Sequence, residues 1–391
     1  MRQGTLRPWR SHAGLVSLLV TLLLLLALVL TLVNLQRQQL GFDDFALTDW
    51  LIAYDGAFVR RGLGGELLWQ FERVSGIAMP ITVFVIAAVA YVLLTVTAIR
   101  LAWRFNRLAE LLLLASPATA FFTAFEPGAA GRKELLLLLI PALFLWRPSG
   151  QPPGRTQLLL LTAALSCLLL LHEGLFFFYP LLGVFFWIYW GCPPRPWALL
   201  GRPALMLTLL MAMITLLNRL YPPNVQALCD LLAVRHYSLA HCAEPLMTAV
   251  SWLDVSVAQV WSLLDGRMTI DRLISVVTGL LLTALPVALL PWRRDVARVA
   301  MLATACTLPL FVVAIDWGRW LYVISTLLLY IYAAAWVGRG QQSDRIGPRV
   351  SVLTAFVLVC WVSAWQLLHC CVMGAEWGLV AKVAALATHW L

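Results

Sequence analysis

Long, nearly uninterrupted apolar runs constrain the fold of this chain more than any other feature. Hydrophobic residues make up 62% of the 391-residue sequence and charged residues only 12%. The apolar residues gather in runs of about 18 to 24 residues, the length at which a helix crosses the hydrocarbon core of a bilayer. The sequence therefore predicts an all-α, polytopic membrane protein that forms a single transmembrane domain over residues 1–391.

About eleven spans are predicted from these runs. The run at 156–190 is roughly 52 Å long as a helix, too long for one crossing, so we expect two short spans joined by a turn at 172–174. The first run lacks a small-residue cleavage site and is interpreted as a retained span. Residues 374–391 are interpreted as an interfacial tail. The predicted spans are 14–34, 79–99, 108–125, 134–146, two within 156–190, 203–218, 271–291, 298–315, 321–337 and 350–371.

Charged residues orient these spans. Arg2, Arg7 and Arg10 precede the first span, so the positive-inside rule places the N-terminus in the cytoplasm. Two long segments then lie outside. Residues 35–78 are expected to form one or two amphipathic helices on the membrane surface, and 219–270 form the second segment. The short loops between the spans favour a bacterial inner membrane.

The outer side carries nearly all of the acidic groups. Of the 19 acidic residues, all but Glu110, Asp295 and Asp344 fall there. They gather in four polar clusters: the segment 41–66, EPGAAGRKE at 126–134, HEG at 172–174 and DWGRW at 316–320. Ionisable groups at span ends are costly unless they are paired or functional. Each cluster therefore predicts either local ion pairs, such as Asp316 with Arg319 and Glu134 with Arg132, or part of a site.

A site built from these residue types would act on a phosphate-linked substrate. A carboxylate can serve as general base for a hydroxyl nucleophile, while Arg and Lys neutralise charge on a leaving phosphate. At the outer leaflet this favours a polyprenyl-phosphate-linked sugar as partner, besides the lipid bilayer itself.

Several other classes of site have no motif in the sequence. It contains no HExxH or CxxC spacing, no P-loop and no GxSxG elbow, so no cofactor is expected, and a divalent metal is possible but not indicated. The basic residues are scattered between spans, which does not indicate nucleic-acid binding. No feature identifies a protein partner. Cys229 and Cys242 share the second outer segment and are candidates for a disulfide.

The layout resembles the GT-C superfamily of membrane glycosyltransferases. In that family a long outer loop with surface helices and a catalytic Asp follows the first span, and a second outer loop carries a further acidic residue. Here the first loop holds four aspartates, and the second holds Glu126 beside Arg132 and Lys133. The four are Asp43, Asp44, Asp49 and Asp55. The resemblance covers mainly residues 14–146. It implies inverting transfer of a sugar from a polyprenyl-phosphate donor to an envelope glycan or lipid acceptor at the periplasmic face.

The same resemblance implies roles for individual residues. The expected base is Asp49 or Asp44, then Asp55, and Glu126 is a further catalytic candidate. His172, Glu173 and Asp316 are expected to orient the acceptor or the basic groups. The candidates for binding phosphate are Arg60, Arg61, Arg132, Lys133 and Arg319. No metal ligands are predicted.

Other functions fit the same sequence. An O-antigen-type polymerase or ligase also works outside, on polyprenyl-pyrophosphate glycans, although its main loops usually come later in the chain. A transporter or lipid flippase would place charged or broken-helix sites near the midplane. Central charges are absent from five of the predicted spans: 14–34, 79–99, 271–291, 321–337 and 350–371. A non-catalytic assembly subunit is a further alternative.

Overall fold

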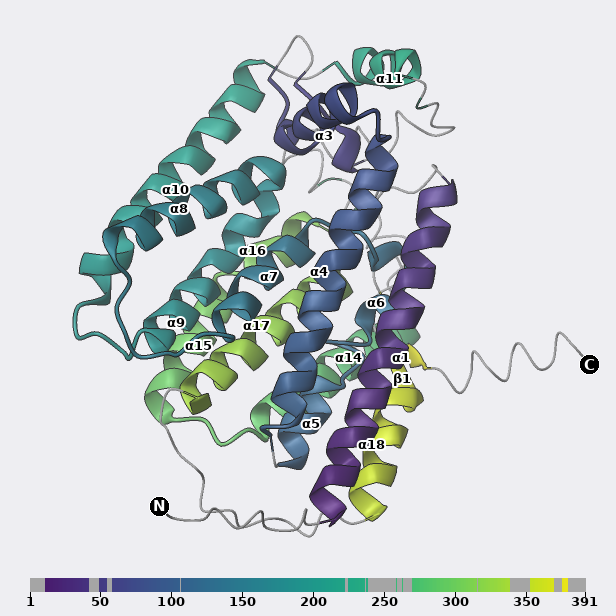
Figure 1. Cartoon of the computed structure of the whole chain (residues 1–391), viewed down its shortest axis with the longest axis vertical. Coiled ribbons are helices and arrows are strands. Elements are labelled where there is room, and N and C mark those ends of the chain that lie inside the picture. Colours follow the sequence, from purple (N-terminus) through teal and green to yellow (C-terminus); the bar gives the residue numbers. More distant parts are fainter. Residues whose placement is uncertain are drawn as a thin grey trace, which may run out of the picture.

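The computed structural model describes most of the chain as a helical bundle (Figure 1). The residues described are 11–41, 49–54, 58–105, 107–221, 224–235, 237, 258, 262, 269–314, 316–337, 352–368 and 375–378. Within them the chain is mostly helical, and a single two-stranded sheet is the exception to the all-α prediction. Asp44, Asp55 and Cys242 lie outside the described residues.

Six helices of the described part are long and apolar enough to cross a membrane. They are Gly14–Gln38 within α1 (Ser11–Gly41), α4 (Met79–Ala102), Leu199–Leu220 within α10 (Pro196–Leu220), α14 (Ile270–Ala288), Arg294–Val313, and Trp317–Trp336 within α17 (Trp317–Val337). These helices identify the chain as a membrane protein. The predicted count of about eleven spans is not confirmed.

The other apolar helices are shorter than a bilayer requires. They are α7 (Glu134–Phe144), α8 (Arg155–Leu171), α9 (Tyr179–Tyr189) with the preceding 3-10 helix η2 (Glu173–Phe178), and α18 (Val352–Ala364). The run at 156–190 does break at His172, as its length requires. There the backbone is extended, and the Nδ1 atom of His172 accepts a hydrogen bond from the Gly174 N–H, 3.1 Å away.

Two predicted spans are interrupted. The run at 108–125 forms α5 (Leu108–Leu114) and α6 (Phe122–Phe125), because Pro117 cannot continue the helix and disfavours the helical conformation at Ser116. The side chains of Ser116 and Thr119 bond to nearby backbone groups in the turn. The run at 298–315 forms α15 (Arg294–Ala305) and α16 (Leu308–Val313), which together make up the Arg294–Val313 candidate span.

The end of the described chain returns to the bundle as a strand. After α18, β1 (Trp365–Leu367) pairs antiparallel with β2 (Ala375–Trp377), and Trp365 lies opposite Trp377. The predicted tail 374–391 is therefore tied to the bundle at least through β2. Residues 379–391 lie outside the described part.

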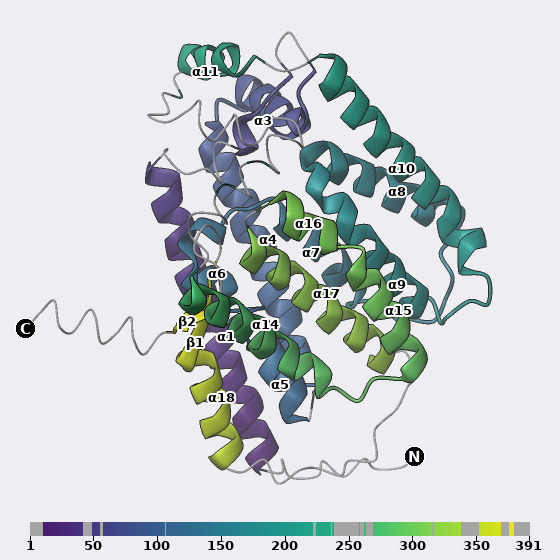
Figure 2. The ribbon, with the colours of Figure 1, turned by 180° about the vertical axis from the view of Figure 1, so that it is seen from behind.

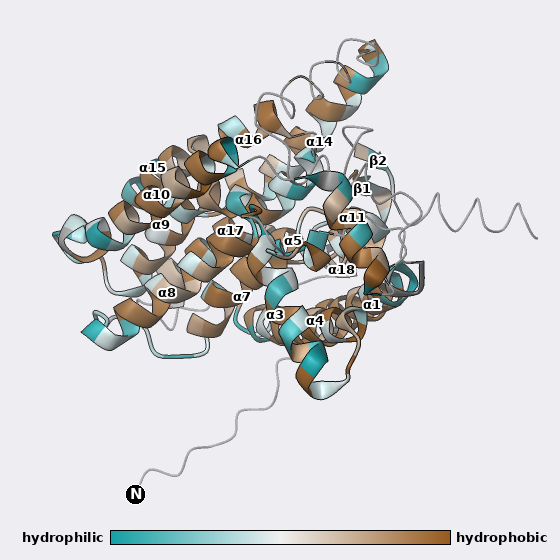
Figure 3. Ribbon diagram, turned by 90° about the horizontal axis from the view of Figure 1, so that it is seen from above, coloured by the Kyte–Doolittle hydropathy of each residue, from teal (hydrophilic) through white to brown (hydrophobic). Residues whose placement is uncertain are grey.

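Helix α17 lies at the centre of the bundle. Within its apolar window 89% of the residues are buried, against 11% for α10. It packs against α7 and α9. The view from behind shows it beside α14, α15 and α16 (Figure 2). Seen along the bundle, most helices are hydrophobic over much of their length (Figure 3), as expected for helices that face either lipid or one another.

The two predicted outer segments meet at one end of this bundle. The first forms α3 (Gly62–Ser75) and the second begins with α11 (Val225–Val234), and both cover the end where α4 starts and α10 stops (Figure 1). The Tyr237 hydroxyl contacts the Glu72 carboxylate at 2.8 Å, and the Arg235 guanidinium lies 4.1 Å from the Trp69 ring centre. Leu67 and Phe71 remain exposed on α3, which agrees with the amphipathic helix expected in 35–78.

Candidate functional site

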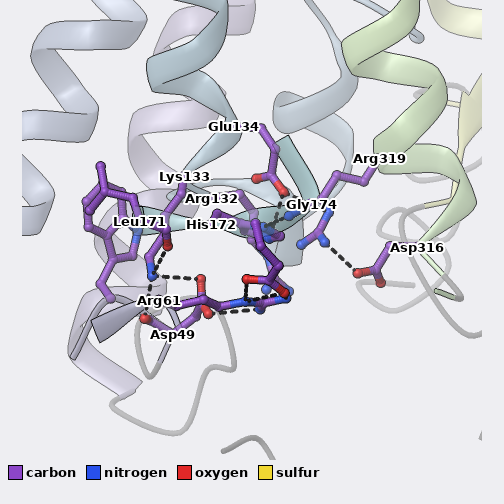
Figure 4. Close-up of polar contacts among 12 residues, drawn as sticks. Asp49, Arg61, Arg132, Lys133, Glu134, Leu171, His172, Gly174, Asp316 and Arg319 are labelled. Atoms are coloured by element: carbon purple, nitrogen blue, oxygen red, sulfur yellow. Dashed lines mark hydrogen bonds and ion pairs between the residues drawn. The ribbon is translucent and has the colours of Figure 1, made fainter. Parts of the chain in front are cut away.

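A buried cluster of ionised side chains, which includes Arg61 at the start of α3, lies where several segments of the chain converge (Figure 4). Asp49, Arg60 and Arg61 come from the segment before α3, and the other groups stand at the ends of α7, α8 and α17. Four acidic and four basic residues are joined by ion pairs: Asp49, Glu134, Glu173 and Asp316 with Arg60, Arg61, Lys133 and Arg319. The cluster is therefore balanced in charge.

The outer half of the cluster is built around Arg61. Its Nε and Nη2 atoms donate to both carboxylate oxygens of Glu173, at 2.8 and 2.7 Å, and its Nη1 donates to Asp49 Oδ1 at 3.1 Å. Arg60 adds a 3.1 Å ion pair to Glu173. The Arg60 and Arg61 side chains are 12% and 13% exposed, so they are the cations that a ligand can reach from the outside.

Lys133 is completely enclosed. Its ammonium group donates to the backbone oxygens of Asp49 and Leu171, at 2.7 and 3.0 Å, and lies 3.2 Å from Asp49 Oδ2. The three protons of a lysine ammonium thus have three oxygen partners. Because the partners belong to different segments, Lys133 fastens the first outer segment and the end of α8 to the start of α7.

Backbone conformation at the start of α3 brings the two arginines to the cluster. Arg61 has a φ of 69°, in the left-handed region that non-glycine residues rarely occupy. Behind it, α3 approaches the chain so closely that a Cβ atom on Gly65 would lie 2.2 Å from the Ile52 carbonyl oxygen. Glycine at that position lets the helix pack there, and the bidentate contact with Glu173 holds the strained Arg61.

In the inner half of the cluster, around Glu134, several polar atoms lack a hydrogen-bond partner. Glu134 is 1% exposed, and its Oε1 lies 3.3 Å from Arg319 Nε and 3.5 Å from His172 Nε2. Neither carboxylate oxygen of Glu134 has a hydrogen bond of good geometry, and the same holds for Arg319 Nε. Arg319 also pairs with Asp316 at 2.8 Å and lies 4.3 Å from the ring centre of Trp320.

The protonation states follow from burial and from these partners. Burial raises the pKa of Asp49, but the neighbouring Lys133 and Arg61 outweigh it, so the pKa lies well below its ordinary value and the group is ionised. Burial lowers the pKa of Lys133, while Asp49 opposes that effect. Burial, with Arg61 nearby, lowers the pKa of His172 to about 4, so His172 is neutral at pH 7. Its Nδ1 accepts from Gly174, which leaves the proton on Nε2, toward Glu134.

Most of the candidate residues predicted from sequence meet in this cluster. They are Asp49, Arg60, Arg61, Lys133, His172, Glu173, Asp316 and Arg319. Arg132 is buried, and its Nε donates to the Gly128 carbonyl at 3.1 Å. Glu126 is partly exposed just after α6.

Glu134 is the residue that sequence reasoning did not place in the site. The expected pair of Glu134 with Arg132 is wrong, because Glu134 begins α7 and faces His172 and Arg319 from other helices. The signal was present in its position, a carboxylate at the first turn of an otherwise apolar helix. The expected pair of Asp316 with Arg319 is confirmed.

No group of three or more His, Cys, Asp or Glu side chains arranged to hold a metal ion occurs in the described part of the chain. Cys229 is disulfide-bonded, and Cys242, its predicted partner, lies outside that part. No family model matches this sequence, and no curated protein or solved structure matches it either.

Proposed function

We propose that this protein is a membrane glycosyltransferase that moves a sugar from a polyprenyl-phosphate-linked donor to an acceptor hydroxyl at the outer face of a bacterial inner membrane. The observation that carries the proposal is the buried cluster, in which carboxylates and cations from four segments gather at one end of a membrane helix bundle. Burying eight ionised groups costs free energy. Stabilising the negative charge that develops on a leaving phosphate would explain why the protein keeps them.

The donor phosphate is assigned to Arg60 and Arg61. These are the least enclosed cations of the cluster, and guanidinium groups bind phosphate oxygens in a bidentate manner. Both hold Glu173 in its place, so the phosphate would take over contacts that this carboxylate now makes. Lys133, fully enclosed, would stabilise the leaving phosphate through the field of its charge and would hold Asp49 in place.

Two carboxylates are candidates for the base. Asp49, expected from the sequence, has both carboxylate oxygens engaged by Arg61 and Lys133. The carboxylate of Glu134 accepts no hydrogen bond of good geometry, so it is the better placed to receive a proton, and Asp49 orients the cations. In the proposed transfer the acceptor oxygen bonds to the anomeric carbon, the bond from that carbon to phosphate breaks with its electrons, and the acceptor proton passes to Glu134.

The test is mass spectrometry of lipid-linked glycans in a deletion strain. We expect a polyprenyl-phosphate monosaccharide to accumulate and one sugar to disappear from an envelope glycan. Accumulation of a polyprenyl-pyrophosphate repeat unit would instead identify a polymerase or ligase. No change in either pool would contradict enzymatic transfer and favour a transporter or an assembly subunit.

Complementation by variants of similar shape locates the site. Glu134→Gln and Asp49→Asn are expected to leave the glycan defect of the deletion strain uncorrected although the proteins reach the membrane. Glu66→Gln is the matched control, because Glu66 accepts a hydrogen bond from Gln70 on the exposed surface of α3, at 2.8 Å, and has no ion pair within the described part of the chain. Full complementation by both cluster variants would show that the cluster is structural.

A further inference from the structure

The carboxylate of Glu173 is held by two arginines in the way that a bound anion would be. Its Oε1 atom lies 3.1 Å from Arg61 Nε, 2.7 Å from Arg61 Nη2 and 3.1 Å from Arg60 Nη1. Its Oε2 atom lies 2.8 Å from Arg61 Nε. Both guanidinium groups thus converge on one side chain, and these two arginines are the least enclosed cations of the ionised cluster.

These contacts suit an oxyanion larger than a carboxylate. Three nitrogen atoms lie within reach of Glu173 Oε1, whereas a carboxylate oxygen has about two lone pairs that can accept hydrogen bonds. The oxygens of a phosphate group are spread over a tetrahedron, so they can share these donors among them. The side of Arg61 that bears Nε and Nη2 is also the edge by which a guanidinium group binds phosphate in a bidentate manner.

Arg61 keeps an anchor when Glu173 is replaced. Its third nitrogen, Nη1, donates to Asp49 Oδ1 at 3.1 Å, and the other carboxylate oxygen of Asp49 lies 3.2 Å from the Lys133 ammonium group. Asp49 therefore orients the far side of the guanidinium group while the edge toward Glu173 changes its partner. A phosphate can take the place of the Glu173 carboxylate without breaking the pair that holds Arg61.

Glu173 stands at a point of the chain from which its side chain can leave the arginines. It is the first residue of η2, and the extended residue His172 separates it from the end of α8. The Glu173 side chain is 10% exposed, whereas Lys133 and Asp49 are 0% and 5% exposed. A change of side-chain rotamer can therefore move the Glu173 carboxylate from the arginines toward water.

Charge makes this exchange a competition. A phosphodiester carries a single negative charge, like the carboxylate that it replaces, and a phosphate monoester carries about −1.5 to −2 at pH 7. Enclosed guanidinium groups without an anion are unstable, so the Glu173 carboxylate occupies the site whenever no other anion does. Every incoming phosphate has to displace it.

We propose that Glu173 is a built-in competitor for the phosphate site of Arg60 and Arg61 and thereby keeps free phosphate out of it. An occupant that is present about 90% of the time weakens the apparent affinity of any other anion about tenfold. A phosphate attached to a lipid is concentrated at the membrane and overcomes this competition. That the displacing ligand is a lipid-linked donor rests on the proposed function, whereas the exchange of carboxylate for phosphate stands by itself.

The test is isothermal titration calorimetry with the purified full-length chain in detergent micelles. The probes are inorganic phosphate and geranyl phosphate, a short isoprenyl phosphate. Glu173→Gln keeps the size of the side chain and removes its charge, so we expect this variant to bind each probe about tenfold more tightly than the wild-type chain. The factor should be the same for both probes, because the competitor acts on the arginines and not on the isoprenyl chain.

A second variant separates competition from a general effect of charge. Glu173→Asp keeps the negative charge but is shorter by one methylene group, so it reaches the arginines less well and should also bind both probes more tightly than the wild-type chain. It takes the place of Glu173→Gln if that variant does not fold. The thermal unfolding midpoint of each variant verifies its fold.

Two controls complete the experiment. Glu66→Gln removes a carboxylate from the same region, where Glu66 accepts a hydrogen bond from Gln70 at 2.8 Å, and its affinities should equal those of the wild-type chain. Arg61→Lys removes the bidentate edge and should abolish binding of inorganic phosphate.

Unchanged or weaker binding by Glu173→Gln would overturn the proposal, because the carboxylate would then orient the arginines for a ligand instead of competing with it. An equal gain by Glu66→Gln, or a gain for geranyl phosphate alone, would overturn it as well.

The competitor and the transfer reaction can fail separately. The titrations need neither a sugar nor turnover. Tighter binding by both Glu173 variants together with unchanged glycan pools in the deletion strain would keep the competitor and refute the transfer. Altered glycan pools without any gain in binding would keep the transfer and refute this role of Glu173.

Discussion

At the scale of single residues, the feature that distinguishes this membrane protein is a lysine with no exposed surface. Lys133 is held by Asp49 and by the carbonyl of Leu171. Removing one partner of a buried ion pair destabilises a protein more than replacing both partners by apolar residues, because the remaining charge stays buried without compensation. Lys133 is therefore expected to matter for stability as well as for function.

Lys133→Met tests this expectation. The substitution keeps the aliphatic stem and leaves the Asp49 carboxylate short of one cation, so we expect a loss of about 3 kcal/mol in the free energy of unfolding. Thermal unfolding in detergent micelles would show this as a lower midpoint. Arg293→Ala is the control, because the Arg293–Asp295 pair is half-exposed and exposed pairs contribute little. A midpoint unchanged by Lys133→Met would mean that Asp49 is not held by this charge.

A second residue-scale prediction concerns pH. Folding lowers the pKa of His172 from 6.5 to about 4. Between pH 6.5 and pH 4, His172 is therefore protonated in the unfolded chain and neutral in the folded protein. The contribution of neutral His172 to the free energy of unfolding is therefore fully present above pH 6.5. It is lost progressively as the pH drops toward 4. A shift of this size corresponds to about 3 kcal/mol over the whole window.

The measurement is the unfolding midpoint between pH 7.5 and pH 4.5. His172→Gln cannot titrate and should show a flatter profile than the wild-type chain. Asp49 contributes only below that window, because its pKa is lowered below the ordinary carboxylate value and its loss of charge begins at more acidic pH. Identical slopes in the two proteins over pH 6.5 to 4.5 would show that His172 is not buried as a neutral group.

At the scale of elements, α3 fixes the position of the two arginines. Its close contact at Gly65 with the Ile52 carbonyl leaves no room for a methyl group. Gly65→Ala must therefore move the helix or the 49–54 segment and disturb the pairs of Arg61 with Asp49 and Glu173. We expect about 3 kcal/mol of destabilisation, an overpacking effect, and loss of complementation.

The matched control for that variant is Gly183→Ala. Gly183 lies in α9, and a Cβ atom there would meet nothing within 4 Å. An alanine in an open helical position is neutral or slightly stabilising. If Gly65→Ala unfolds at the same temperature as Gly183→Ala, the packing of α3 does not hold the cluster.

Element prediction from the sequence succeeded where one run made one helix. The run 79–99 lies within α4 (Met79–Ala102), and the turn at His172 was required by length. It failed in the predicted span 108–125, where Pro117 ends the helix and Ser116 and Thr119 bond to the backbone of the turn. Hydropathy averages over a window and does not register a single proline among apolar residues.

The sequence predicted which polar segments form the site, but it did not predict how all of their side chains pair. The expected topology put four polar clusters on one side, and all of them contribute to the ionised cluster. The pairing itself could not be predicted for Glu134, because its partners come from α17 and from the end of α8. A sequence shows which residues are neighbours along the chain, whereas these pairs depend on which helices pack together.

At the scale of the whole molecule, the bundle has two chemically different ends. The ionised cluster, α3 and α11 lie at one end, and the loops rich in arginine, such as 147–155, lie at the other (Figure 1). The positive-inside rule then predicts which end faces the cytoplasm.

Reporter insertions test that orientation. Gly76 and Gly150 both occupy open turns, where a Cβ atom would meet nothing within 4 Å. Alkaline phosphatase inserted at Gly76 should be active, because it matures only outside the cytoplasm. Green fluorescent protein inserted at Gly150 should fluoresce. The exchanged pair of insertions serves as the control, and activity in the exchanged pair would reverse the proposed orientation.

The shortness of α7 has a consequence for how the protein is made. Its 11 residues extend about 16 Å, roughly half of a hydrocarbon core near 30 Å, and its first residue is the charged Glu134. Such a segment is a poor candidate for insertion into the bilayer by itself. The helix that covers it, α17, and the Arg319 that neutralises Glu134 come only after residue 316. Biogenesis of this protein therefore has a delayed step, in which the centre of the membrane domain is completed by a helix that leaves the ribosome long after α7.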